Sequence, residues 1–118
     1  MFSAALLGII QEAGSAIMIL AEAGTEEEML RSRLTRTEIV RQLAIMAQTL
    51  ANVPEAVRAK IPEVAWDQWQ RLPTQLGASG EAPDEALKFA CSSMVPATLL
   101  WLRHYQQSQP ELFSYVAS

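Results

Sequence analysis

Residues 39–50 read IVRQLAIMAQTL, and residues 51–66 continue as ANVPEAVRAKIPEVAW. In the first segment, four apolar side chains recur at intervals of four, three and four residues: Ile39, Leu43, Met46 and Leu50. This spacing is typical of one face of an α-helix. We therefore expect a helix that begins near residues 35–37 and ends near Ala51.

The prolines of the second segment predict two more helices. Pro54 and Pro62 stand where the first turn of a helix tolerates proline. Pro54 is expected to open a short helix over residues 55–59. Pro62 is expected to open another, which carries three large apolar side chains: Val64, Trp66 and Trp69.

Helical spacing also extends toward the N-terminus, from Phe2 to about Ala23. One stripe has a period of three or four residues: Leu6, Ile10, Ala13, Ile17 and Leu20. Other apolar residues widen this stripe beyond one face: Leu7, Ile9 and Met18. A stripe that wide indicates burial on two sides, as in a bundle that also dimerises. Gly24 suits a C-terminal cap, and Thr25 with Glu28 forms a capping-box pattern that predicts a short helix to about Arg33.

The C-terminal half contains one expected loop and three expected helical segments. The loop lies between Leu72 and Pro83, where Pro73, Gly77 and Gly80 disfavour a helix. Helices are expected over residues 84–93 and 96–107. Pro110 then opens a last turn or two with four apolar residues: Leu112, Phe113, Tyr115 and Val116. The chain is thus predicted to form a single all-α domain over residues 1–118, a bundle of four to five helices with short additional helices.

Composition narrows the functional classes. The chain has 118 residues, half of them apolar, with one His, one Cys and a net charge of −4. One His and one Cys exclude a Cys/His zinc site within one chain, and the negative charge disfavours nucleic-acid binding through bulk positive charge. No unbroken apolar run approaches the ~18 residues of a membrane span, and the first basic residue is Arg31, which disfavours a secretory signal. We expect a cytoplasmic protein without a metal, a cofactor or a membrane.

Charge is distributed unevenly along the chain. Residues 1–30 carry −5, residues 31–60 carry +4, and the rest carries −3. Four arginines follow the acidic cluster at Glu26–Glu28: Arg31, Arg33, Arg36 and Arg41. We expect them to lie near that cluster or to face solvent. A nucleic-acid patch is the weaker alternative, because no aromatic residues are interleaved with them.

The stretch from Ile39 to Trp66 resembles the HepT-like branch of the HEPN superfamily. In that branch, a helix ending in a Leu-x-Ile-Ile-Gly-Glu-Ala-like run precedes a short helix and a Pro-Glu-Ile-x-Trp box. Residues 43–49 occupy the position of the run, and residues 62–66 (PEVAW) match the box. Three later residues look like the family's Asp, Trp and Leu-Pro positions: Asp84, Phe89 and Pro96. The resemblance covers about residues 9–102 and implies a homodimeric all-α bundle from a toxin–antitoxin pair with a nucleotidyltransferase.

The ribonuclease motif of that family is missing. Active members use an Arg, a His five residues later and often a Tyr two residues beyond it, because RNA cleavage needs a proton-transfer group and a cation for phosphate. The Gly-Glu of the first run is replaced by Ala47-Gln48. The three motif positions fall on residues without the required groups: Pro73, Ala78 and Gly80. The resemblance therefore implies a degenerate member without catalytic residues.

Other chemically suggestive residues have simpler interpretations. His104 fits the last turns of a helix, where the dipole favours it, and Cys91 fits a buried apolar position. Glu22 and Glu26–Glu28 lack the facing acids of a magnesium site. Five aromatic residues fit the core or a dimer interface, with a small-molecule pocket as the alternative: Trp66, Trp69, Trp101, Tyr105 and Phe113.

Three functional hypotheses follow. The first is a non-enzymatic homodimer that binds a nucleotidyltransferase or a ribonuclease homologue. Its expected dimer surface consists of Leu6, Ile10, Ile17, Trp101 and Tyr105. The second is a weak RNA-directed ribonuclease that uses Arg71 and His104 across the dimer. The third is a helical bundle that binds a small molecule in a Trp-lined pocket.

Overall fold

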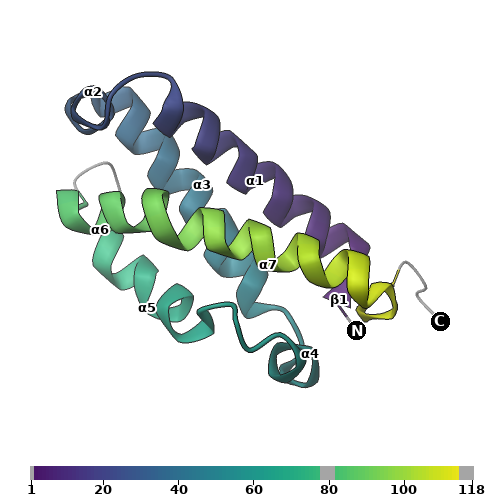
Figure 1. Cartoon of the computed structure of the whole chain (residues 1–118). Helices are drawn as coiled ribbons and strands as arrows, with labels where there is room; N and C mark the ends of the chain where they lie inside the picture. Colours follow the sequence, from purple (N-terminus) through teal and green to yellow (C-terminus); the bar gives the residue numbers. More distant parts are fainter. Residues whose placement is uncertain (1, 78–81, 115–118) are drawn as a thin grey trace.

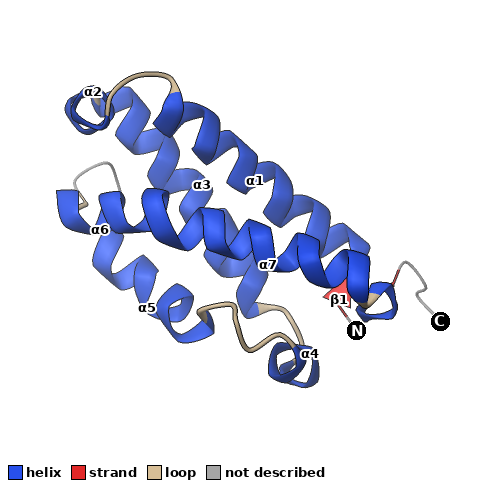
Figure 2. Ribbon diagram, in the orientation of Figure 1, coloured by secondary structure: helices blue, strands red, loops and turns tan. Residues whose placement is uncertain are grey.

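The computed structural model describes residues 2–77 and 82–114, and within these ranges the chain is almost entirely helical (Figure 2). The α-helices are α1 (Ala4–Glu22), α2 (Glu26–Arg31), α3 (Arg33–Ala51), α4 (Glu55–Lys60), α5 (Trp66–Leu76), α6 (Asp84–Phe89) and α7 (Val95–Ser108). A π-helical segment, η1 (Ala90–Met94), joins α6 to α7, and a 3₁₀ turn, η2 (Pro110–Leu112), follows α7. The all-α prediction is confirmed.

The core lies between the three longest helices. α1 and α3 run side by side in opposite directions, with α7 packed against α1 and α5 packed against α3 (Figure 1). The apolar face predicted on α3 is confirmed, since its four members are at most 1% exposed. Ile10 and Ile17 of α1 and Leu102 of α7 are fully buried in the same core cluster. Each such side chain stabilises the fold by about 1.5–3 kcal/mol relative to an exposed position.

Local capping sets the boundaries of α2 and α3. The Thr25 hydroxyl accepts a hydrogen bond from the Glu28 backbone N–H at 3.1 Å, and the Glu28 carboxylate accepts one from the Thr25 N–H at 2.8 Å, so the predicted capping box is confirmed. The expected end of α2 at Arg33 and start of α3 at residues 35–37 are wrong. Ser32 ends α2 and caps α3, because its hydroxyl accepts from the Thr35 N–H at 3.2 Å. Gly24 is not in the left-handed conformation, which among the described glycines only Gly77 adopts.

The predicted helix opened by Pro62 begins four residues later, at Trp66, and it extends further than expected. α5 passes through Pro73 and ends at Leu76, so the expected loop from residue 73 is wrong. Proline in a helix costs roughly 3 kcal/mol. Leu72 and Leu76 lie on either side of it and are 1% and 3% exposed. Their burial offsets that cost and holds the last turn of α5 in place.

The two helices expected over residues 84–93 and 96–107 form one continuous helical run. Pro96 lacks an N–H, and its ring clashes with the carbonyl four residues earlier in a regular α-helix. The π-helical segment η1 widens the spiral just before it, and the Val95 N–H donates to the carbonyl of Ala90, five residues back. The wider turn accommodates Pro96 without a break, which explains the wrong boundary.

Two short strands join the ends of the described chain. β1 (Phe2–Ser3) pairs in parallel with β2 (Phe113–Ser114), with Phe2 opposite Phe113. The sequence placed both phenylalanines in helices, and that placement is wrong. Only a few residues at each end follow the helical pattern. The backbone pairing that replaces a helix there joins two segments that lie close together only in the folded chain. Tyr115 and Val116, expected in the last turn, lie outside the described residues.

The arginines that follow the acidic cluster have different partners. Arg31 contacts Glu27 at 3.2 Å, as expected, whereas Arg41 pairs with Glu38 at 2.6 Å. Arg33 is exposed. Arg36 instead reaches the start of α6, where it contacts Asp84 at 2.6 Å with its own side chain only 12% exposed.

α1 is long and apolar enough to cross a membrane by length and composition, the one such helix among the described residues. Core helices of soluble proteins and signal sequences meet the same criteria. Only 28% of its most apolar 18-residue window is buried in the chain. α1 therefore presents apolar surface that the rest of the chain does not cover.

Candidate functional site

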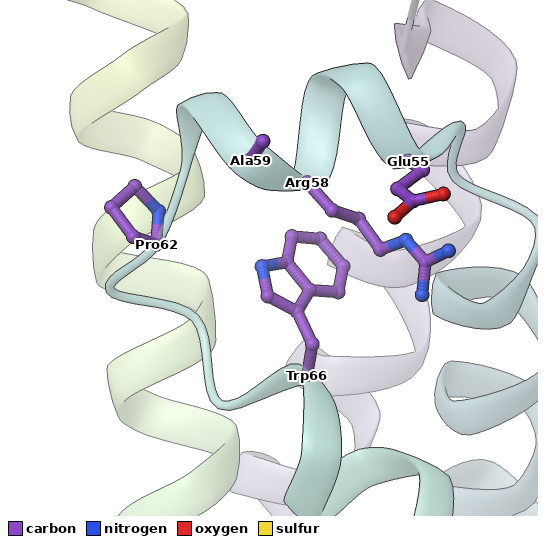
Figure 3. A pocket seen from close by; sticks show the side chains of 5 residues that line it. All are labelled: Glu55, Arg58, Ala59, Pro62 and Trp66. Atoms are coloured by element: carbon purple, nitrogen blue, oxygen red, sulfur yellow. The ribbon is translucent and has the colours of Figure 1, made fainter.

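An open hollow of about 380 Å³ lies between α4 and the start of α5. Five residues line it: Glu55, Arg58, Ala59, Pro62 and Trp66. Figure 3 shows the Trp66 ring rising from α5 toward α4, with the Arg58 side chain beside it. Glu55 lies on the same side as the guanidinium, while Pro62 lies on the other side of the Trp66 ring.

The connection between α4 and α5 fixes this geometry. The Trp66 indole N–H donates to the carbonyl of Ile61 at 2.9 Å, and Ile61 itself is fully buried. Val64, which the sequence placed inside a helix, is buried just before α5. Glu63 accepts a 2.7 Å hydrogen bond from the Tyr105 hydroxyl, so the connection is also tied to α7. The PEVAW box thus shapes one wall of the pocket through its own structural contacts.

Arg58 is the most unusual group in the pocket. Its Nε is shielded from solvent and hydrogen-bonds no atom among the described residues. Its guanidinium forms no salt bridge within those residues, although Glu55 precedes it by only three positions. A buried polar group without a partner costs about 1–3 kcal/mol, so its presence calls for an explanation.

The five aromatic residues that the sequence assigned to the core or a dimer interface lie in different surroundings. Trp69 is 1% exposed, and its indole N–H donates to Oγ1 of Thr98 at 2.9 Å, which makes it a core residue. Trp66 lines the pocket described above. Trp101 and Tyr105 are close on α7, with ring centroids 6.4 Å apart. The Phe113 side chain lies outside what the structure describes.

The second hypothesis required Arg71 and His104 to act together across a dimer. Arg71 lines a separate hollow beside Phe89 and Met94. His104 stands ten residues beyond Met94 along the same helical run, about 15 Å away. It is exposed and meets the Trp101 and Tyr105 rings edge-on, with centroids 5.7 and 5.4 Å away. A single chain therefore does not bring these two side chains together.

The expected dimer-surface residues divide into two groups. Ile10 and Ile17 are fully buried in the core of the single chain, so their side chains offer no surface to a second copy. Leu6 and Trp101 are half-buried and pack against the core, and Tyr105 is 9% exposed with its hydroxyl on Glu63. The pKa of Tyr105 is raised by this hydrogen bond to the Glu63 carboxylate. Burial and the Glu63 charge raise it further.

Three of the four acidic residues considered for magnesium have structural partners. Glu28 closes the capping box, Glu27 contacts Arg31, and Glu26 lies 3.7 Å from Lys88. Within the described ranges, no group of three or more His, Cys, Asp or Glu side chains could hold a metal ion.

Cys91 is 6% exposed, as expected for a small apolar core residue. It borders a hollow of about 280 Å³ together with Met18 and Met29. Burial, and then the charge of Glu26, raise the pKa of its thiol to about 11. The thiol is therefore neutral near pH 7, which disfavours a nucleophilic role.

The sequence did not single out Glu55 or Arg58 as site residues. The only local indication was a Glu and an Arg three residues apart in a short helix, a pattern that surface helices commonly use for ion pairs. Their position beside Trp66 depends on the turn at residues 61–65, which sequence periodicity does not describe.

Comparisons with known proteins give no relative: no protein-family model matches the chain, and no curated protein or solved structure is significantly similar to it.

Proposed function

We propose that the protein is a non-enzymatic helical module that binds another protein chain through the outward face of α1, and that this partner is a second copy. The supporting observation is the incomplete burial of a largely apolar helix. Ile9 and Ile19 of α1 are 44% and 70% exposed. Large apolar side chains left exposed on one helix indicate a contact surface when a partner covers them together.

The same face offers a place to receive a side chain. A hollow of about 310 Å³ lies over α1 and α3, lined by Ile9, Glu12, Ala13, Ala16, Gln42 and Ile45. In an antiparallel pairing of two α1 helices about Ser15–Ala16, Ile19 of each copy lies over this hollow of the other. The two Glu12 carboxylates are then well separated along the axis. A two-fold symmetric contact uses the same surface patch on both subunits, so a patch that carries both a protruding side chain and a hollow can pair with its copy.

Gly8 supports close helix contact on this face. A Cβ at this position meets no atom within 4 Å, so nothing inside the chain requires glycine there. Glycine inside a helix costs about 0.5–1 kcal/mol relative to alanine. A neighbouring helix that approaches the backbone closely would give the residue a role.

The resemblance to HepT-like proteins points the same way, since that family pairs as homodimers. It also suggests a second partner, a nucleotidyltransferase or an active ribonuclease homologue, in the setting of a toxin–antitoxin pair. Pro73 in α5 supplies no catalytic group, and the other two motif positions, Ala78 and Gly80, lie outside the described residues. The proposal is therefore binding without ribonuclease activity.

Light scattering coupled to size exclusion tests the proposal. Wild type is expected to elute with twice the 13.0 kDa chain mass, and Ile19→Glu is expected to be monomeric. Leu34→Glu is the matched control, because Leu34 is 85% exposed at the start of α3, outside the proposed contact. A wild-type monomer at about 100 μM contradicts the proposal. The dissociation constant of a specific dimer is well below that concentration, so the protein would be dimeric there. If the wild type is monomeric and binds neutral lipid vesicles, and Ile19→Glu does not bind them, the proposed second copy is wrong and the α1 face contacts a membrane instead.

A further inference from the structure

The pocket between α4 and α5 contains a guanidinium, that of Arg58, which forms no salt bridge with a described carboxylate. Arg58 is half-buried, its Nε is closed off from solvent without a partner, and no described carboxylate forms a salt bridge with it. Partial burial of an unpaired cation is costly. An anion in the adjoining hollow is the simplest source of the missing charge.

The walls of the pocket define the shape of that anion. Trp66 supplies an aromatic surface, held in place by its hydrogen bond to the Ile61 carbonyl at 2.9 Å. Pro62 and Ala59 are apolar, exposed residues at the border of this open hollow (Figure 3). A flat apolar body fits such walls, because aromatic rings stack favourably against an indole. The volume, about 380 Å³, is within the range of small-molecule sites.

The charge on the rim limits the charge of the ligand. Glu55 lies beside Arg58, and its carboxylate repels a second negative charge (Figure 3). Repulsion by Glu55 is weaker for a monoanion than for a dianion such as phosphate. Guanidinium binds carboxylate through paired N–H donors, which favours a carboxylate as the anionic group.

We propose that this pocket binds a small planar monocarboxylate, with its ring against Trp66 and its carboxylate on the guanidinium of Arg58. Benzoate is the simplest probe of this chemistry. The site is independent of the α1 face, so dimerisation and carboxylate binding succeed or fail separately.

Titration of the ¹⁵N-labelled protein with benzoate, followed by two-dimensional NMR, tests the proposal. The indole N–H signal of Trp66 is expected to shift and saturate, while that of the buried Trp69 stays in place. Benzamide, a neutral analogue of the same shape, and inorganic phosphate are expected to bind at least about tenfold more weakly. Trp66→Phe identifies the Trp66 indole signal.

Variants assign the charges. Arg58→Gln is expected to weaken benzoate binding about tenfold or more, because it removes a charge-assisted contact. Glu55→Gln is expected to tighten it about two- to fivefold by removing a repulsive charge. Arg71→Gln, which changes an exposed arginine on the neighbouring part of α5, is the matched control and should bind as wild type. If Arg58→Gln fails to fold, the benzoate affinity of Glu55→Gln, a substitution at an exposed position, still tests the proposal.

Three results overturn the proposal. One is the absence of saturable shifts at up to about 20 mM benzoate, a concentration that detects even very weak sites. The second is equal affinity for benzoate and benzamide. The third is binding that Arg58→Gln and Glu55→Gln both leave unchanged.

Discussion

The indole N–H of Trp69 donates a 2.9 Å hydrogen bond to Oγ1 of Thr98, and both side chains are at most 2% exposed. The bond joins α5 to α7 across 29 positions of sequence. It satisfies the one polar atom of an otherwise apolar side chain in the core. Trp69 can therefore occupy the core without the cost of an unpaired N–H.

Thr98→Val is expected to destabilise the protein by about 1–3 kcal/mol, because it leaves the buried Trp69 N–H without an acceptor at nearly unchanged side-chain volume. Urea unfolding followed by circular dichroism measures the change. Thr74→Val on α5, an exposed position, should stay within about 0.5 kcal/mol of wild type. Equal effects at the two positions contradict a structural role for the bond.

Acid is expected to weaken the fold partly through Glu38. Its hydrogen bonds from Arg41 and then from Gln42 lower its pKa from 4.5 to about 2. Because the folded pKa is below the unfolded one, the carboxylate contributes stability above about pH 4.5 that is lost as the pH falls toward 2. The melting temperature of Glu38→Gln should therefore be below that of wild type near pH 7. Near pH 2 the two melting temperatures should be nearly the same. Glu111→Gln, an exposed site in η2, is the control. A deficit of Glu38→Gln that is the same at both pH values contradicts the expectation.

Short-range sequence patterns predicted the elements that depend on short-range contacts. Thr25 and Glu28 form their capping box within a few residues, and the apolar face around Leu43 is a repeat within one helix, so both were visible in the sequence. Pro73 and Pro96 were misjudged because their tolerance depends on more than the local pattern. Burial of Leu72 and Leu76 holds α5 together, and a π-helical segment accommodates Pro96.

The candidate site was less predictable than the fold. Trp66 was noticed as part of an aromatic set, yet its separation from Trp69 and Trp101 follows from how α5 and α7 pack. Arg58 has no sequence signature, since its isolation from other charges is a property of the folded chain. Ile10 and Ile17 were assigned to a dimer surface because a stripe of apolar residues does not show which part of it the same chain covers.

Cys91 is expected to resist alkylation in the folded protein. Its pKa of about 11 leaves roughly one thiol in a thousand ionised at pH 8, and only the thiolate reacts. Iodoacetamide labelling followed by mass spectrometry should be at least about a hundredfold slower in the native protein than in urea, where the thiol regains an ordinary pKa. Comparable rates in the two states contradict burial of the thiol.

Two glycines of α1 provide a matched pair with opposite expectations. A Cβ at Gly14 falls 2.8 Å from Cδ2 and 3.1 Å from Cγ of Leu99, so Gly14→Ala must displace this side chain of α7. A Cβ at Gly8 meets nothing within 4 Å. Gly8→Ala should stabilise the monomer by about 0.5–1 kcal/mol through reduced backbone entropy. Gly14→Ala should be net destabilising by about 0.5–2 kcal/mol, because overpacking exceeds that gain. Urea unfolding at low protein concentration compares them, and equal stabilisation by both substitutions shows that Leu99 does not set the distance between α1 and α7.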